Sequence, residues 1–248
     1  MMTLHADMKQ RAVVHAASQP WVDSPMPGVA RRALHRVGDE VAQATSLVRY
    51  APGSHFSAHT HAGGEEFLVL SGTFQDEHGD YPAGTYVRNP IGSRHIPRSD
   101  EGCVIFVKLW QFTEADHVPV VLNAESAARA TSPARPGVTT SLLYQSATEE
   151  VRLERWEAGG TQVDIDLPGG GEFLVLQGAF EEGGDTFAPM SWLRLPSGSR
   201  LQARTADQPV LVWMKLGHVP LLDVGGALHW GPSARDQFDL PLTSPSPR

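Results

Sequence analysis

GSHFSAHTHAGGEEFLVLSG, residues 53–72, is the stretch that decides the fold. His59 and His61 stand two positions apart, and side chains at this spacing on a β-strand point to the same face. Glu65 follows a loop with two glycines, which let the backbone turn tightly. The carboxylate can therefore approach from the neighbouring strand. The stretch predicts three side chains that converge on one metal ion inside a small barrel.

A second stretch supplies a fourth candidate ligand. GTYVRNPIGSRH, residues 84–95, ends in His95, and the turn around Pro90 and Gly92 places this histidine on a separate hairpin. Three imidazoles and one carboxylate suit Fe, Mn, Ni, Co, Cu or Zn, whereas Ca and Mg sites are built from oxygen. We expect one divalent transition metal per chain.

The chain contains an internal repeat. EFLVLSG at residues 66–72 returns as EFLVLQG at residues 172–178, which is 106 residues later. This offset, which one inserted residue raises to 107 from Phe106 onward, makes residues 37–112 and 142–218 the two units of a tandem duplication. Within each unit the apolar runs are short, β-rich and separated by Gly, Pro and Asp, which is typical of a small antiparallel barrel. The predicted fold class is all-β, with two such barrels.

The second unit lacks every candidate ligand. At the offset of 106 residues, the ligand positions are occupied by Ile165, Leu167, Gly171 and Leu201. None of these residues offers a side-chain donor to a metal. We expect the second barrel to be metal-free and kept for packing.

Both ligand stretches resemble the two motifs of the cupin superfamily, except that Ser99 replaces the usual terminal asparagine of the second motif. This resemblance implies a bicupin, a tandem double-stranded β-helix of two antiparallel jelly-roll barrels. HTHAGGEE (59–66), DEHGDY (76–81) and RNPIGSRH (88–95) are similar to the cupin domain of ChrR-type anti-sigma factors. By the same resemblance the metal ligands are His59, His61, Glu65 and His95.

The start of the chain departs from ChrR. Those regulators bind sigma through a separate N-terminal helical domain that holds zinc with His and Cys. Here the N-terminal segment is short and has no cysteine. We therefore expect no anti-sigma partner, and only the ligand-sensing or catalytic half of the architecture is carried over.

These boundaries divide the chain into five segments. They are an N-terminal extended arm (1–36), the metal-binding barrel (37–122), a linker (123–138), the metal-free barrel (139–230) and a C-terminal tail (231–248).

Composition limits the partners and the compartment. A net charge of −8 argues against nucleic acid or an anionic membrane as a general partner, because phosphate binding needs a basic face. The single cysteine, Cys103, cannot form an internal disulfide, and residues 1–20 lack the apolar core of a secretory signal. We expect a cytoplasmic protein with a small-molecule substrate or ligand, and a homodimer stays open.

The duplication also helps to interpret the other polar residues. A metal site that only the first unit has cannot explain a polar residue that recurs in both units. For such residues we expect strand-edge ion pairs or solvated faces; they are Arg49, Glu66, Arg88, Arg94 and Lys108, with Arg155, Glu172, Arg194, Arg200 and Lys215 as their repeats. Tyr86 and Phe106 occur only in the metal barrel and are candidates for the pocket, although core packing is the commoner role of such aromatics. Tyr86 and Glu65 are the candidate catalytic residues.

Two functions are compatible with these ligands, and the identity of the metal decides between them. Six-coordinate iron with four protein ligands would leave two positions open, enough for a chelating diketone or enol, or for substrate and dioxygen. Zinc prefers four ligands, so the protein alone would close its coordination shell and make a structural or ligand-binding module, such as a ChrR-like sensor. Manganese or nickel would also fit. We expect a metal-dependent oxidoreductase of the dioxygenase type, with the zinc module as the alternative.

Overall fold

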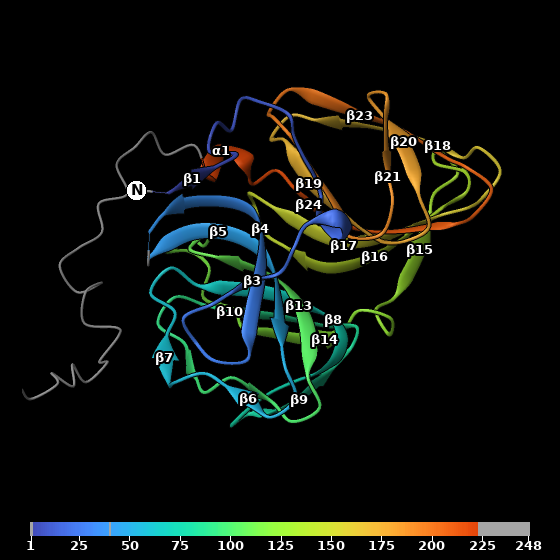
Figure 1. Ribbon diagram of the computed structural model, residues 1–248. Helices are drawn as coiled ribbons and strands as arrows, with labels where there is room; N and C mark the ends of the chain where they lie inside the picture. Colours follow the sequence, from blue (N-terminus) through green and yellow to red (C-terminus); the bar gives the residue numbers. More distant parts are fainter. Residues whose placement is uncertain (1, 40, 223–248) are drawn as a thin grey trace, which may run out of the picture.

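The computed structural model describes residues 2–39 and 41–222, and almost all of its regular structure is antiparallel strand. Figure 1 shows two barrels stacked on each other, the first coloured blue to green and the second yellow to orange. The helical segments of the described chain are a 3-10 turn at Ala16–Ser18 and α1 at Val219–Leu222. The predicted all-β fold of two antiparallel barrels is confirmed.

The first barrel consists of one large sheet and one small sheet. The large sheet has the path β1-β4-β5-β13-β8-β10-β14, with β3, β6, β9 and β12 at its margins. Its strands are β1 (Thr3–Leu4), β3 (Val22–Asp23), β4 (Val29–Gly38), β5 (Ala42–Tyr50), β6 (Ser54–His55), β8 (Glu65–Asp76), β9 (Gly79–Pro82), β10 (Thr85–Asn89), β12 (Arg98–Ser99), β13 (Cys103–Leu109) and β14 (Val120–Asn123). The small sheet pairs β7 (His59–Thr60) with β11 (Arg94–His95).

The second barrel repeats this plan with a seven-stranded and a four-stranded sheet. The larger sheet contains, in order, β15 (Arg129–Thr131), β16 (Val138–Gln145), β17 (Glu150–Trp156), β24 (Val210–Leu216), β19 (Gly171–Gln177), β22 (Ser191–Leu195) and β2 (Ala12–His15). The smaller sheet contains β18 (Gln162–Leu167), β23 (Ser199–Thr205), β20 (Phe180–Glu182) and β21 (Asp185–Phe187).

The two barrels exchange edge strands. β2, near the start of the chain, pairs with β22 of the second barrel, and β14 pairs with β10 of the first. The expected arm (1–36) therefore contributes β2 to the second barrel, and β1, β3 and most of β4 to the first. The expected linker (123–138) carries β15, and the expected tail (231–248) lies outside the described residues. Each barrel thus completes its sheet with chain from outside its own repeat.

An apolar layer fills the space between the barrels. Along β8, Phe67 and Val69 point into the first barrel, while Leu68 between them joins a cluster shared by both sheets. In that cluster Phe106 and Trp213, which occupy equivalent places in the two repeats, have ring centroids 4.8 Å apart. These apolar side chains between the barrels are therefore as fully buried as those of the two barrel cores.

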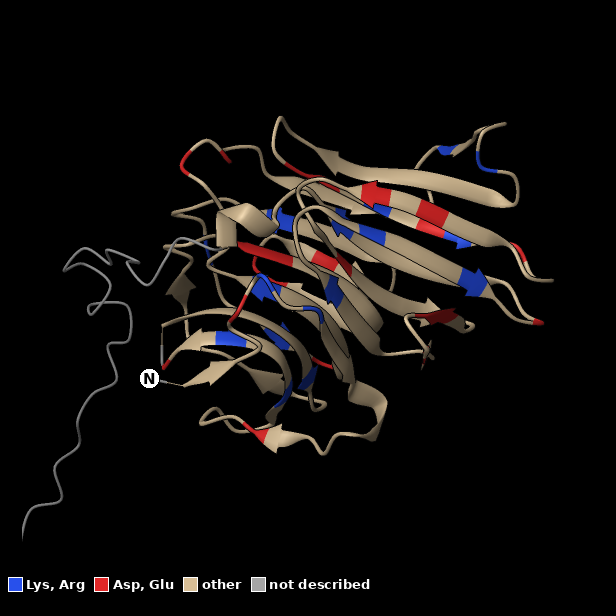
Figure 2. Ribbon diagram, turned by 90° about the horizontal axis from the view of Figure 1, so that it is seen from above, with Lys and Arg blue, Asp and Glu red and all other residues tan. Residues whose placement is uncertain are grey.

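Charged side chains cross this layer as two ion pairs. Lys108 Nζ lies 2.6 Å from a Glu172 oxygen, and Lys215 Nζ lies 2.6 Å from a Glu66 oxygen. Each lysine pairs with the glutamate of the opposite barrel, although the glutamate of its own barrel is its register neighbour. Figure 2 shows such acidic and basic segments next to each other in the central strands.

The expectation of strand-edge or solvated positions is wrong for three of the recurring pairs. The buried residues are Glu66, Arg88 and Lys108 and their repeats Glu172, Arg194 and Lys215. Their strand parity directs them out of one barrel and against the other, so they meet protein instead of water. Arg49 and Arg94, by contrast, have exposed side chains as expected.

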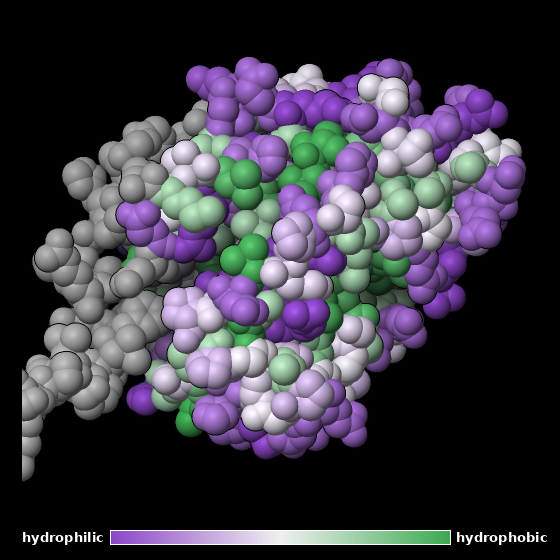
Figure 3. All heavy atoms as spheres, in the orientation of Figure 1, coloured by the Kyte–Doolittle hydropathy of each residue, from purple (hydrophilic) through white to green (hydrophobic). Residues whose placement is uncertain are grey.

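The outer surface is mixed. On the face in Figure 3, hydrophilic residues predominate at the margins, and apolar residues form small groups between them. Within the described ranges, no helix has the length and apolar character needed to cross a bilayer.

We expect the crossed pairs to dominate acid stability. Burial raises the pKa of Glu66, but the charges of Lys215 and Arg88 outweigh burial and lower it from 4.5 to about 2. A carboxylate with a depressed pKa stabilises the fold fully above its unfolded pKa, and this stabilisation is lost as the pH falls through the folded pKa. Glu66→Gln should cost about 3–5 kcal/mol at neutral pH. It should also flatten the stability profile between pH 4.5 and about 2.

Denaturant unfolding of metal-free protein over this pH range measures both effects. Arg94→Ala, at an exposed recurring position, is the control and should behave like the parent protein. An unchanged acid slope in Glu66→Gln would contradict the role of the crossed pairs.

Truncation after residue 138 should give poorly soluble protein. The fragment would expose the apolar layer and leave Lys108 without Glu172, and β2 would lose its partner β22. Size-exclusion chromatography of the fragment tests this, and a monomeric fragment with full metal content would refute it.

Candidate metal centre

The three histidines come together at one end of the first barrel. In the β7–β11 ribbon, His95 lies directly opposite His59. His61 follows β7, and its backbone N–H donates to Ser93 at 2.9 Å, which fixes the loop beside the ribbon. His59, His61 and His95 each direct a ring nitrogen into a space where these atoms lie within 4.8 Å of one another.

Glu65 reaches the same space from the first position of β8. Its Oε2 lies 3.3 Å from Nε2 of His61 and 3.7 Å from Nε2 of His95, and those two nitrogens are 2.9 Å apart. Two ligands bound at 90° to one ion at about 2.1 Å would be about 3.0 Å apart. The donor spacing and the donor chemistry therefore both fit a transition metal at this site.

Hydrogen bonds orient the histidines. Nδ1 of His95 lies 3.2 Å from Oδ2 of Asp76, and Nδ1 of His59 lies 2.9 Å from the Ser57 carbonyl oxygen. In both rings these contacts leave Nε2 for the shared space, as in carboxylate–histidine–metal arrangements. The amide of Asn89 donates to Glu65 at 2.9 Å and holds the carboxylate in place.

The pKa values show how the ring environments differ. Burial lowers the pKa of His61 to about 4, so this imidazole is neutral at physiological pH and can offer its lone pair. Burial also lowers the pKa of His95, but the hydrogen bond to Asp76 and the charge of Glu65 outweigh burial and raise it. Burial raises the pKa of Glu65, but the nearby histidines outweigh burial and lower it, so Glu65 stays ionised.

The loop before Glu65 needs its glycines for packing as well as for turning. A Cβ on Gly63 would lie 2.3 Å from the Trp110 ring. Trp110 itself has φ +58, a left-handed conformation that is rare for a bulky residue, whereas the equivalent Gly217 in the second barrel has φ +88. Such a conformation costs about 1–3 kcal/mol. The first barrel therefore accepts strain to place an indole beside the candidate metal centre.

A cavity of about 170 Å³ opens from the cluster. Its lining includes His59, His61, Glu65 and Trp110, together with small or apolar side chains on β5 and β13. His59 is only half-buried, whereas His61 and His95 are buried. The cluster is accordingly accessible to a small molecule through this cavity.

The structure does not bring Tyr86 to the site, which corrects its assignment as a candidate catalytic or pocket residue. Its strand parity sends the ring into the layer between the barrels, where its hydroxyl donates to Glu66 at 2.5 Å. Phe106 packs in the same layer. Both residues therefore serve the inter-barrel core.

The strands of the second barrel pair in the same register as those of the first, but its equivalent positions carry no metal-binding side chains. Ile165 lies opposite Leu201 just as His59 lies opposite His95, which confirms the sequence alignment of the two repeats. Leu167 and Leu201 are buried in the apolar core of that barrel. Hydrocarbon side chains, together with Gly171, occupy the four equivalent positions.

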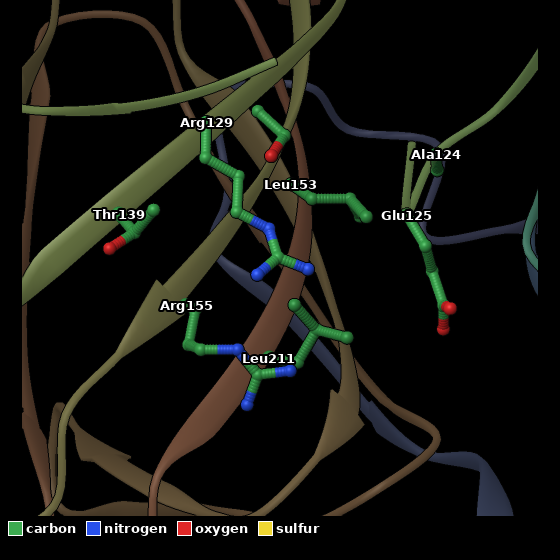
Figure 4. A pocket seen from close by; sticks show the side chains of 8 residues that line it. Ala124, Glu125, Arg129, Thr139, Leu153, Arg155 and Leu211 are labelled. Atoms are coloured by element: carbon green, nitrogen blue, oxygen red, sulfur yellow. The ribbon is translucent and has the colours of Figure 1, made fainter. Parts of the chain in front are cut away.

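A separate cavity of about 270 Å³ lies on the second barrel, next to β15, β16 and β17. Figure 4 shows the side chains of Arg129 and Arg155 extending into the same space. In the first barrel, Trp21 fills the corresponding place and stacks against Arg32 and Arg49. The cavity is lined by no histidine or cysteine, so it is not a second candidate for a transition metal.

Several site residues were not found from the sequence. The positions of Asp76 and Asn89 in the sequence do not predict their contacts with His95 and Glu65. Arg31 and Arg36 also line the cavity, from β4. Only the register of β4 against β5 reveals that these side chains point inward.

Known proteins share this architecture. The family model of the ChrR cupin-like domain matches residues 9–113, and no curated protein matches the chain. A candidate dioxygenase from Nostoc punctiforme is 17% identical, with 84% of this chain and 82% of that chain covered and a TM-score of 0.68. Oxalate decarboxylase from Bacillus subtilis is 13% identical, with 83% and 76% covered and a TM-score of 0.59. At these identities the likeness concerns the fold alone.

His95→Ala and Arg94→Ala should separate metal binding from other effects at this site. His95→Ala removes a ligand from a separate hairpin, so metal affinity should fall by at least about 100-fold and the metal-loaded protein should melt at a lower temperature. Arg94 is exposed, so its loss should leave metal content unchanged. Elemental analysis and thermal unfolding measure both. Metal loss in Arg94→Ala with retention in His95→Ala would show that the ligand assignment is wrong.

Proposed function

Since this chain is a bicupin whose residues 9–113 match the ChrR cupin-like domain, we propose that its first barrel is a metal-dependent oxidoreductase site. The proposed reaction is an oxygen-dependent oxidation or cleavage of a small substrate of the diketone or enol class. His59, His61, Glu65 and His95 would hold one divalent transition metal, with iron the best fit for this chemistry and manganese or nickel as other candidates. Bound there, the metal would polarise the two chelating oxygens of the substrate and activate dioxygen.

The observation that carries this proposal is the cavity beside the cluster. A purely structural zinc site is closed by its protein ligands and needs no opening. Here the donor end of a 170 Å³ cavity is formed by His59, His61 and Glu65 themselves. A chelating molecule could therefore approach the ion from within the barrel. The strained backbone at Trp110 supports the same interpretation, because strain of this kind concentrates at functional sites.

The protein groups have distinct roles in this proposal. The ionised carboxylate of Glu65 is placed to accept the proton that an enol loses when it chelates, while Asn89 keeps the carboxylate oriented. Asp76 holds the ring of His95. Trp110 and the apolar floor of the cavity exclude bulk water from the reacting oxygens.

One alternative is a zinc-binding sensor or ligand-binding module. The match of residues 9–113 to the ChrR cupin-like domain favours this alternative, because that domain is named after a regulator. In the module, the same four side chains would close the coordination shell of zinc and stabilise the barrel.

Metal analysis and oxygen uptake distinguish the two functions. Protein purified without added metal should contain about one iron per chain and consume oxygen with 2,4-pentanedione or a catechol-like enol. A His61→Ala variant should lose both the metal and the uptake. One zinc per chain without oxygen uptake after iron exchange would refute the enzyme and support the module.

A further inference from the structure

The cavity beside the candidate metal centre contains an arginine without a partner. Arg31 lies opposite Val48 in the β4–β5 register and shares the cavity with His59, His61 and Glu65. In the described part of the chain, no side chain or carbonyl pairs with its guanidinium. The neighbouring Arg36 is different, because it donates to the carbonyl oxygens of Gly38 and Asp39.

The guanidinium of Arg31 is partly shielded from water, which disfavours its positive charge. Burial lowers the pKa of Arg31, and the charge of Arg36 lowers it further, although Tyr50 raises it. An arginine side chain nevertheless stays protonated in proteins, and a partly desolvated guanidinium gains most from a carboxylate that it can bind in bidentate geometry. The groups beside Arg31 across the sheet are Val48 and the phenol of Tyr50, which carry no negative charge at neutral pH.

In the second barrel, protein side chains alone form an ion pair at the position equivalent to Val48. The repeat offset puts Glu154 where the first barrel has Val48, and Arg152 where it has Ser46. Glu154 receives Arg135 at 2.6 Å and 2.7 Å, Arg152 at 2.8 Å and the indole N–H of Trp156 at 2.8 Å. The second barrel therefore supplies both the carboxylate of Glu154 and the guanidinium groups that neutralise it. The first barrel supplies the cation Arg31 but has the apolar Val48, and no carboxylate, at the position equivalent to Glu154.

We propose that the substrate of the first barrel is a small organic acid, whose carboxylate is held by Arg31 while its two chelating oxygens face the metal ligands. This proposal rests on the proposed function, and it narrows the substrate to the acidic members of the diketone or enol class. The substrate carboxylate takes the place that Glu154 fills in the second barrel. The cavity, of about 170 Å³, has room for an acid of a few carbon atoms.

A matched pair of probes tests this inference. 2,4-Dioxopentanoate and 2,4-pentanedione share a diketone, but only the first carries a carboxylate. Calorimetric titration of metal-loaded protein without oxygen should show tighter binding of the acid. Arg31→Gln should weaken binding of the acid by about 10- to 100-fold, because a charge-assisted hydrogen bond is lost. Binding of the neutral diketone and the metal content should stay within about twofold of the parent protein.

Arg32→Gln is the control, because Arg32 is the next residue of β4 and stacks outward on Trp21 at 4.3 Å. It should leave the binding of both probes unchanged. Val48→Glu provides an independent second test, since it introduces the carboxylate that the second barrel has. That variant should pair with Arg31 and abolish binding of the acid while its metal content is kept.

The outcomes separate this inference from the proposed reaction. Oxygen uptake with the neutral diketone, together with equal binding of the acid by Arg31→Gln and parent protein, overturns the carboxylate role and leaves the reaction standing. Binding of the acid that depends on Arg31, without oxygen uptake for either probe, overturns the reaction and leaves the ligand class standing.

Discussion

The crossed ion pairs between the barrels are the constraint on which the rest of the structure depends. Lys108 with Glu172 and Lys215 with Glu66 are each 2.6 Å apart, and the buried side chains of Arg88, Glu149 and His218 join them in the layer between the barrels. A buried charge is tolerated only when its partner is placed correctly, so the two sheets have one favourable arrangement. The exchanged edge strands β2 and β14 reinforce that arrangement. The second barrel therefore supplies the partner charges of the first, and it takes β2 from the start of the chain into its own sheet.

With the scaffold fixed, the two barrels diverged in their interiors. One interior contains the histidine cluster, a cavity and a strained Trp110. The other contains hydrocarbon at the ligand positions, an ion-pair cluster around Glu154 and an unstrained Gly217. Each difference removes stability from the first barrel or adds it to the second. Under our proposed function, the first barrel would hold the metal site and the second would support it.

The charge states of the side chains in the first barrel indicate what kind of ligand its cavity suits. His61 is kept neutral by burial, and Glu65 is kept ionised by the histidines, so the donors are ready for a cation. The same cavity contains Arg31, and none of the ion pairs among the described residues joins its guanidinium to a carboxylate. A metal would satisfy the donors and an acid would satisfy the arginine. Together, these groups support our proposal that the ligand is a chelating organic acid.

The sequence by itself determined the tandem all-β fold and the ligand candidates His59, His61, Glu65 and His95, because a repeat and a strict spacing are local properties of the chain. It also indicated which positions had lost their donors. The direction in which each strand residue points was decided only by tertiary structure, since a shift of one residue in register turns every side chain to the other face. For that reason the sequence alone shows neither that Tyr86 packs between the barrels nor that Arg31 lines the cavity.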